Sequence, residues 1–489
     1  MTEHFDVAIV GAGISGIGIA YYLKQRCPDK SFVVLEGLER FGGTWTTHRY
    51  PGIRSDSDLN TYGYSFKPWV GSFTATAAEI LNYLGEVINE NGLASHIRYQ
   101  HHLEAVKWSS KEHSWTIEGV RQDTGEAIRL TCNFLSMCQG YYRHAQGYTP
   151  QWEGMDDFAG EIVHPQTWPQ DLDYEDKEVL VIGSGSTMST LVPAIAYDAK
   201  HVTVLQRSPT FFFPIGDEDN LAEQLRALDI DESWIHEIVR RKRIYNGQLF
   251  ARRAAAEPEV VREELIAAVR QQLPEGYDVE THFMPQYRPW QQRIARVPNG
   301  DFFTSIRDGR TTMVTDEIER FTEQGVLVKS GRELPADIAV TATGFDLCVF
   351  GDIAFTVDDR PVDFAATITY RGTMFTGVPN MAWVFGYFRA SWTLRVDLVG
   401  DFICRLLRHM DQRGCKSVVP TPRLDQREMP LSPWVAPEDF SPNYIRRALH
   451  LLPKTGDVPE WQHTQDYWQD KDVFPAIDLD DPAYVCIDK

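Results

Sequence analysis

The sequence predicts an α/β protein with two Rossmann-like dinucleotide-binding domains and a helical insertion. A short apolar strand followed by a glycine-rich turn and a helix occurs near the N-terminus and again from residue 178. Farther along, a stretch rich in charges shows helical rather than strand periodicity. We therefore expect one domain from residues 1–149 and 346–489, a second from 150–212 and 289–345, and the insertion at 213–288.

The composition is that of an ordinary globular protein and argues against several partners. The 489 residues are 43% hydrophobic and 24% charged, with a net charge of -21, which disfavours nucleic acid and anionic membranes. The start lacks a signal-peptide pattern and no apolar run approaches the ~20 residues of a membrane span, so we expect a cytoplasmic protein. The seven scattered cysteines predict reduced thiols rather than a disulfide framework.

The first glycine-rich turn opens a dinucleotide-binding unit. An apolar run at residues 5–10 leads directly into G-A-G-I-S-G and a helical stretch that extends to about residue 26. Gly11 permits the tight turn, Gly13 lets a pyrophosphate approach the backbone, and Gly16 lets the helix pack closely on the strand. Strand, turn and helix in this order are much more specific than the glycines alone.

The rest of the first unit follows the same plan. The next strand, residues 31–35, ends at Glu36, where the fingerprint expects a carboxylate that binds a ribose hydroxyl. Residues 76–91 have the apolar spacing of a helix, and short alternating runs from 97 to 138 predict a small antiparallel sheet.

A second unit begins with the apolar strand at residues 178–182. It leads into G-S-G-S-T-M, in which Gly183 and Gly185 keep the pyrophosphate-facing positions. Met188 takes the place of the third glycine, so we expect helix and strand to lie slightly farther apart here. The helix start adds two further cofactor-binding candidates, Ser186 and Thr187.

The two units differ in the residue that follows their second strand. After the strand at 202–205, Arg207 and Ser208 stand where the first unit has Glu36. A guanidinium can pair with the 2′-phosphate that distinguishes NADPH, whereas a carboxylate would repel it. The second unit is therefore predicted to bind NADPH, and the first a dinucleotide without that phosphate.

Between the units, residues 158–169 match the pattern F-x-G-x-x-x-H-x-x-x-W-P. We interpret the stretch as a hinge in which glycine allows a tight turn and the histidine and tryptophan anchor the segment; a plain linker is the alternative. Its fixed positions are Phe158, Gly160, His164, Trp168 and Pro169. Together with the two glycine turns, this stretch resembles the flavin-dependent Baeyer-Villiger monooxygenases.

The resemblance extends over almost the whole chain and implies further site residues. It places FAD in the first unit and NADPH in the second. It also implies that the G-G-T-W run lies against the flavin, that Y-P-G-x-x-x-D carries an aspartate into the active site, and that an arginine lies beside the flavin. The implied residues are Gly43, Thr44, Trp45, Asp56, Arg293 and Trp392. The runs SGRELPAD, VPNGD and ASWTL are similar to the subgroup that includes the mycobacterial ethionamide-activating monooxygenase.

By that resemblance, the expected reaction is NADPH- and O2-dependent conversion of a ketone to an ester or lactone through a peroxyflavin, with sulfoxidation as a side activity. Arg293 would be the main catalytic residue and Asp56 its support. Two alternatives stay open: an N- or S-oxygenating flavin monooxygenase, and a non-oxygenating flavoprotein of the NADPH oxidase type. No metal-binding motif is evident, and the expected partners are a small ketone and O2.

Two departures from the family and one terminal feature carry further expectations. Gln292 replaces a lysine that relatives use to hold the 2′-phosphate, which leaves NADPH selectivity more dependent on Arg207. Arg389 stands where asparagine is expected and is predicted to narrow or charge the pocket. The last twenty or so residues are rich in Asp and Pro and predict a loosely held tail.

Overall fold

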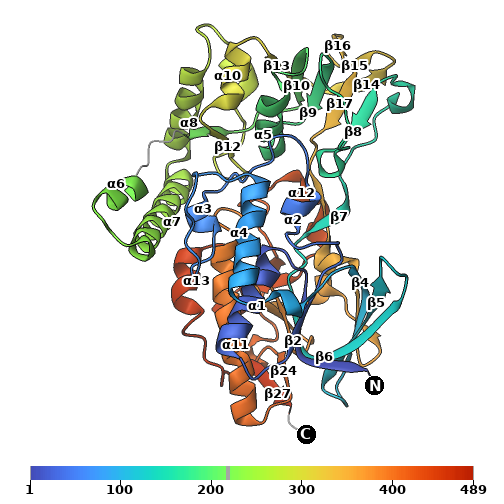
Figure 1. Ribbon diagram of the computed structural model, residues 1–489, viewed down its shortest axis with the longest axis vertical. Helices are drawn as coiled ribbons and strands as arrows, with labels where there is room; N and C mark the ends of the chain where they lie inside the picture. Colours follow the sequence, from blue (N-terminus) through green and yellow to red (C-terminus); the bar gives the residue numbers. More distant parts are fainter. Residues whose placement is uncertain (1, 216–220, 488–489) are drawn as a thin grey trace.

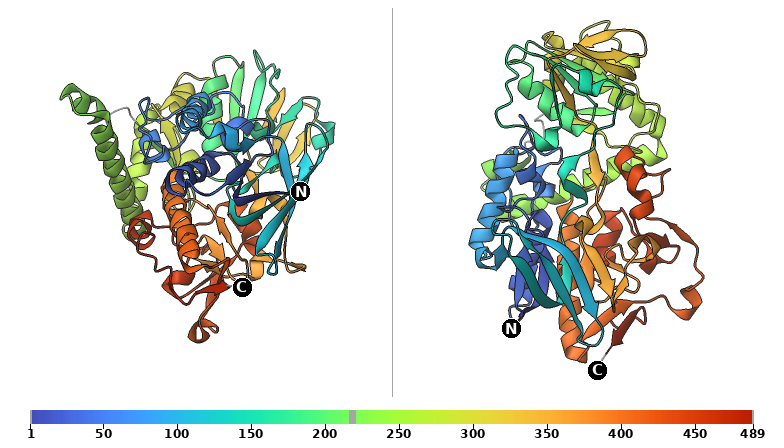
Figure 2. Two further views of the ribbon diagram at one scale, coloured as in Figure 1. Left: turned by 60° about the horizontal axis from the view of Figure 1, so that its bottom comes forward. Right: turned by 90° about the vertical axis from the view of Figure 1, so that its right-hand side faces the viewer.

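The computed structural model describes residues 2–215 and 221–487 and contains two large β-sheets, one in each half of the molecule (Figure 1). The predicted α/β class is confirmed. In Figure 2 the two halves are stacked end to end, and the N- and C-termini both lie at the end of the half that holds the larger sheet.

The larger sheet combines a parallel and an antiparallel part. β1 pairs in parallel with β2 and β6, while β4, β5 and β6 form an antiparallel meander. Its strands are β1 (Glu3–Val10), β2 (Phe32–Leu35), β3 (Ile97–Arg98), β4 (His101–Ser109), β5 (Ser114–Arg121), β6 (Ala127–Met137), β19 (Ala354–Val357), β20 (Arg360–Pro361) and β23 (Met381–Trp383).

Three helices share one apolar core with one face of this sheet: α1 (Ile14–Arg26), α4 (Ala77–Glu90) and α11 (Thr393–Arg413). α4 begins with a capping box between Thr76 and Glu79 and buries one apolar face, as its spacing predicted. α11 packs along α1, although the two helices come from opposite ends of the chain. The C-terminal segment is thus part of the first domain's core.

The smaller sheet is entirely parallel, in the order β13-β10-β9-β17-β8. Two of its inner strands, β9 and β17, are nearly continuous apolar runs because both of their faces are covered. The strands of this sheet are β8 (Glu161–Val163), β9 (Glu178–Ile182), β10 (His201–Gln206), β13 (Thr311–Thr315) and β17 (Ile338–Thr341). α5 (Ser186–Ile195) and α10 (Asp301–Arg307) flank it, and a small antiparallel sheet is attached, comprising β14 (Ile318–Thr322), β15 (Gly325–Val328) and β16 (Glu333–Pro335).

The stretch predicted as a helical insertion contains α6 (Leu221–Ala227), α7 (Glu232–Ala256), α8 (Pro258–Gln272) and α9 (Val279–Phe283). It is flanked by β11 (Phe212–Ile215) and β12 (Ala295–Pro298), which pair with each other in parallel. α7 is held against the first domain because Arg240 donates to the carbonyls of Asn60 and Gly63, at 2.9 and 2.7 Å.

Two short strands form the connection between the halves. β7 (Tyr142–Gly147), which lies between the two halves in Figure 1, pairs antiparallel with β18 (Phe345–Leu347), the strand that follows β17 in the chain. The remaining short elements are α2 (Thr44–Thr47), α3 (Leu59–Tyr62), β21 (Thr369–Tyr370), β22 (Met374–Phe375), β24 (Ser417–Pro420), β25 (Leu431–Pro433), α12 (Asn443–Ala448), β26 (Lys454–Gly456), α13 (Tyr467–Val473) and β27 (Tyr484–Ile487).

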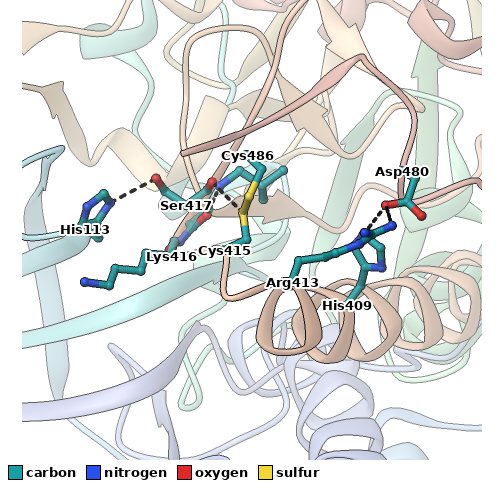
Figure 3. The surroundings of a disulfide bond; sticks show 10 residues. His113, His409, Arg413, Cys415, Lys416, Ser417, Asp480 and Cys486 are labelled. Atoms are coloured by element: carbon teal, nitrogen blue, oxygen red, sulfur yellow. Dashed lines mark hydrogen bonds and ion pairs between the residues drawn. A yellow bond between two sulfur atoms is a disulfide. The ribbon is translucent and has the colours of Figure 1, made fainter. Parts of the chain in front are cut away.

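Two expectations about the C-terminal region were wrong. The chain does not end in a loose tail within the described residues, because β27 pairs with β24 and Asp470 forms a buried ion pair with Arg395. Nor are all cysteines reduced: Cys415 and Cys486 form a disulfide (Figure 3). Cys415 lies just before β24 and Cys486 lies in β27, and their Cα atoms are 5.8 Å apart, a separation that a disulfide spans readily.

Candidate functional site

A cavity of about 950 Å³ lies between the two sheets and is lined by both glycine-rich turns. It is located at the carboxyl ends of β1 and β9, which is where open α/β sheets bind ligands. Its wall is completed by the loop that follows the G-G-T-W run, by β7, and by residues of the C-terminal segment such as Trp392 and Tyr444.

The first glycine turn combines tight packing with one open position. Gly11 has φ +99° and donates its N–H to the carbonyl of Leu35, at 2.8 Å. A Cβ on Gly16 would lie 1.8 Å from the carbonyl oxygen of Gly11, so only glycine fits there. A Cβ on Gly13 would meet its nearest atom, on Gly43, only at 3.7 Å. Gly13 is therefore open toward the cavity, as a pyrophosphate would require.

Glu36 lies at the edge of the cavity and joins the ends of β1 and β2. One carboxylate oxygen accepts from the N–H of Ala12 at 2.6 Å, and the other accepts from the N–H of Leu38 at 2.8 Å. Burial raises the pKa of Glu36, and these backbone hydrogen bonds oppose that rise. The carboxylate stands beside the turn where a ribose hydroxyl would bind.

Aromatic side chains form one wall of the cavity. Trp45 donates its indole N–H to the hydroxyl of Tyr62 at 3.0 Å, and Trp392 donates to Ser15 at 2.7 Å. The ring of Tyr141 stacks on Trp392 with centroids 5.2 Å apart. Gly43, with φ +54°, precedes Thr44 at the start of α2 and brings the backbone close to Gly13. The result is a flat, largely apolar surface of the kind on which a ring system packs.

The second glycine turn is open in the same way. Gly183 has φ +119° and donates its N–H to the carbonyl of Leu205 at 2.8 Å. A Cβ built on Gly185 would meet no atom within 4 Å, so this glycine faces free space. Ser186 and Thr187 line the cavity at the start of α5, while Met188 is fully buried in the core beneath them.

Asp56 and Arg293, which are far apart in the sequence, meet in the cavity. A guanidinium nitrogen of Arg293 lies 3.7 Å from a carboxylate oxygen of Asp56, and Ser186 donates a hydrogen bond to that same oxygen at 3.1 Å. Asp56 thereby links the loop of the first domain to the second glycine turn. Both side chains are about one-third exposed.

The surroundings of Arg293 favour its charged form. Burial opposes the charge, but the oxygens of Tyr444, Tyr141, Tyr142 and Asp56 outweigh this effect and hold the pKa of Arg293 well above its ordinary value. The hydroxyls of Tyr141 and Tyr142 lie 2.5 Å apart and form part of the same polar cluster. A fixed cation therefore stands in the cavity at any working pH.

The stretch at 158–169 lies next to the connection between the halves and outside the cavity lining that the described residues form. His164 accepts from the N–H of Gln166 and donates to the carbonyl of Gly344, both at 3.1 Å. Phe158 and Trp168 are buried in the smaller sheet's cores. Pro169 follows them and is half-buried.

The expected role of Gly160 as a tight turn was wrong. Gly160 is not among the residues with positive φ, but a Cβ there would lie 2.2 Å from the carbonyl oxygen of Asp337. The glycine is required because β8 starts against the chain that leads into β17, where Glu161 donates its N–H to that same carbonyl.

Two predicted cofactor-binding residues, Arg207 and Ser208, are not part of the cavity lining. Both are exposed just beyond the end of β10, whereas Gln292 lines the cavity. The expectation that Arg389 narrows or charges the pocket was wrong: its guanidinium is directed at the carbonyls of Trp290 and Asp439.

Sequence reasoning missed several residues of the site. Tyr444 comes from α12 and lines the cavity, but no motif surrounds it in the sequence. His48, next to the Y-P-G motif, is 5% exposed and donates from Nδ1 to the carbonyl of Thr44 at 3.1 Å. Burial lowers the pKa of His48 to about 4. The adjacent tyrosines 141 and 142 were the only visible signal for the polar cluster.

Residues 2–215 and 221–487 contain no group of three or more side chains suited to hold a metal ion. In the same described ranges, no helix combines the length and apolarity that crossing a membrane requires.

Comparison with known proteins identifies relatives of the whole chain. Residues 9–73 match the model of the NAD(P)-binding Rossmann-like domain. The chain is 46% identical over 484 residues to the FAD-containing monooxygenase EthA of Mycobacterium tuberculosis, covering 98% of this chain and 97% of that protein. Among solved structures it is similar to an oxidised steroid monooxygenase bound to NADP, with TM-score 0.79, 23% identity and coverage of 99% and 100%. A cyclohexanone monooxygenase with bound ε-caprolactone gives TM-score 0.73, 19% identity and coverage of 99% and 100%.

Proposed function

The chain belongs to the FAD-containing monooxygenases related to EthA, and we propose that it uses NADPH and O2 to convert ketones to esters or lactones, a Baeyer-Villiger oxidation. Its cofactors are FAD and NADP. We assign FAD to residues 1–149 and 346–489, NADP to 150–212 and 289–345, and the helical insertion to 213–288. The observation that carries the proposal is the Arg293–Asp56 pair in a cavity shared by both glycine turns.

The residues present fit both cofactors. Gly13 and Gly185 leave open space where each pyrophosphate would approach the backbone, and Glu36 would receive a ribose hydroxyl of FAD. The surface formed by Gly43, Trp45 and Trp392 would hold the flavin ring. When bound, the flavin supplies the redox chemistry, since NADPH reduces it and it passes electrons to O2.

Arg293 is suited to stabilise charge on the ketone. As a ketone is attacked, negative charge develops on its carbonyl oxygen and requires a fixed positive partner. Arg293 remains protonated at any working pH and cannot lose its proton to a basic oxidant. Asp56 restrains the guanidinium, and Ser186 restrains Asp56, so the cation is oriented from both domains.

The wall of the cavity serves the same reaction by limiting water. The aromatic wall consists of Trp45, Tyr62, Tyr141 and Trp392. Their polar atoms are hydrogen-bonded to each other or to neighbouring side chains. A shielded site strengthens the interaction of Arg293 with the developing charge. Sulfoxidation is expected as a side activity, because a sulfide needs an electrophilic oxidant and no fixed cation.

Product analysis tests the proposal. The FAD-loaded protein is incubated with NADPH, air and a panel of linear, cyclic and aryl ketones, and the products are identified by mass spectrometry. We expect at least one ketone to gain one oxygen atom as an ester or lactone. NADPH consumption that yields hydrogen peroxide with every ketone would indicate the oxidase alternative, and oxygenation of amines or sulfides alone would indicate the N- or S-oxygenating alternative.

A further inference from the structure

We propose that Arg389 is a positioning residue for Arg293: it fastens the bend at 288–291, which precedes Arg293, to the loop at 436–441. The inference rests on the proposed function, because it concerns the cation that the reaction uses. Arg389 does not touch that reaction directly, since its guanidinium is occupied by backbone carbonyls.

The contacts of Arg389 join two segments that are otherwise remote in the chain. Its Nε donates to the carbonyl of Trp290 at 3.3 Å, and one terminal nitrogen donates to the carbonyl of Asp439. The guanidinium carbon also lies 5.9 Å from the ring centroid of Phe440. A planar guanidinium presents several donors in fixed directions, so one side chain can hold two carbonyls at a set separation.

Other hydrogen bonds show that the bend and the loop form one contact. Arg288 donates to the carbonyl of Glu438 at 2.9 Å and lies 3.2 Å from a carboxylate oxygen of Asp439. The N–H of Ser441 donates to the carbonyl of Gln291 at 2.8 Å. The hydrogen bond from Arg389 to the carbonyl of Trp290 lies between these two contacts, which are made by Arg288 and Gln291.

The bend itself requires outside support. Trp290 has φ +65°, a left-handed conformation that is unfavourable for a bulky side chain and persists only where the surroundings hold it. The carbonyl of this same residue is the one that Arg389 binds. Loss of the guanidinium would therefore release the most strained residue of the bend.

Both joined segments lead into the cavity within three residues. Arg293 follows Trp290, and Tyr444 follows Ser441; both line the cavity, and Tyr444 is among the groups that favour the charged form of Arg293. A shift of the bend would move Arg293 relative to Asp56, from which it is already separated by 3.7 Å. Small displacements of a charge at a reacting centre have large effects on rate.

The test compares four FAD-loaded variants with the wild type. Arg389→Met removes the hydrogen-bond donors and keeps the length of the side chain. Arg389→Lys keeps the positive charge but lacks the planar set of guanidinium donors. Arg389→Asn is a second variant for the case that Arg389→Met disturbs folding. Arg413→Met is the control, because Arg413 pairs with Asp480 at the exposed end of α11 and lies outside the cavity lining.

Two readouts separate positioning from general stability. Hydrogen exchange of residues 288–293 and 436–444 should accelerate about tenfold in Arg389→Met and Arg389→Asn, since losing one hydrogen bond of ~1.4 kcal/mol is a factor of ten. The share of NADPH electrons released as hydrogen peroxide should rise in the same variants, with flavin content and the KM for NADPH unchanged. Arg389→Lys should restore part of both, and Arg413→Met should match the wild type.

Unchanged exchange in both segments, or faster exchange with wild-type coupling of NADPH to product, would overturn the inference. A wild type that forms no ester from any ketone would overturn the proposed function instead. The exchange measurement would then still decide whether Arg389 fastens the bend, because it does not depend on the reaction.

Discussion

At the scale of single residues, the proposed choice of coenzyme and the charge in the cavity rest on a few side chains. Arg207 and Glu36 follow equivalent strands in the two units and carry opposite charges. Asp56 and Arg293 face each other across the two domains, and Ser186 connects Asp56 to the second glycine turn. Arg207, Asp56 and Arg293 lie outside the buried core, so the first prediction at this scale concerns binding.

Replacing Arg207 with Ala should weaken NADPH binding selectively. A guanidinium paired with the 2′-phosphate contributes a charge-assisted bond, whose loss corresponds to about a tenfold rise in the KM for NADPH. The KM for NADH, which lacks that phosphate, should hardly change. Steady-state kinetics with both coenzymes measures this, and equal losses for both would remove the 2′-phosphate assignment.

His48 should make the protein sensitive to acid. Because its pKa in the folded state is about 4, below the 6.5 of the unfolded chain, the unfolded chain binds a proton first as the pH falls. Stability is therefore lost between pH 6.5 and 4, by about 3 kcal/mol for this residue. Urea unfolding at pH 7 and pH 4.5 should show a smaller loss in His48→Asn than in the wild type. An identical pH dependence in both proteins would refute the assignment.

Among the elements, the glycine turns make the sharpest distinction between structure and binding. A Cβ at Gly16 would collide with the backbone, whereas one at Gly185 or Gly13 would meet only open space or ordinary contact. The two open positions are thus free of a structural requirement of their own. We attribute the glycines at these positions to the close approach of a pyrophosphate to the backbone.

We therefore expect Gly13→Ala and Gly185→Ala to fold normally and to fail in different ways. Gly13→Ala should be purified with less FAD, and Gly185→Ala should keep its FAD but bind NADPH at least about tenfold more weakly. Flavin absorbance and coenzyme titration measure the two effects. If Gly185→Ala lost flavin, or Gly13→Ala lost only NADPH affinity, the assignment of the two units would be reversed.

Local sequence patterns predicted the elements well where burial is continuous. The strand at 178–182 was predicted at its observed bounds, because a buried parallel strand is an uninterrupted apolar run. The reason for Gly160 was missed, since its close approach to Asp337 depends on the packing of β8 beside β17. The contacts of Arg389 and the place of Tyr444 in the cavity likewise depend on the C-terminal segment folding back onto the site.

On the scale of the whole molecule, the C-terminal segment completes the first domain. α11 packs on α1, β27 pairs with β24, and the Cys415–Cys486 disulfide closes a loop with a sequence separation of 71 (Figure 3). The pairing could not be predicted from cysteine number or spacing. It depends on the tertiary pairing of β24 with β27, because Cys415 lies just before β24 and Cys486 lies within β27.

Cys486→Ser should lower the free energy of unfolding without altering the site. Closing a loop of this length stabilises a protein by up to about 4 kcal/mol, and neither cysteine lines the cavity. Thermal unfolding of the variant should match that of the wild type under reductant, with flavin content unchanged. A wild type that does not respond to reductant would show that the thiols are free.

The two halves meet where Arg293 faces Asp56, and the most direct test is to remove that cation. Arg293→Ala should retain FAD and be reduced by NADPH, yet lose ester formation by at least ~100-fold, as expected for the loss of one preorganised oxyanion donor. The measurement is the partition of NADPH electrons between ester and hydrogen peroxide, with a ketone that the wild type oxidises. The account predicts that the variant releases hydrogen peroxide in place of ester; ester formation at the wild-type rate would contradict it.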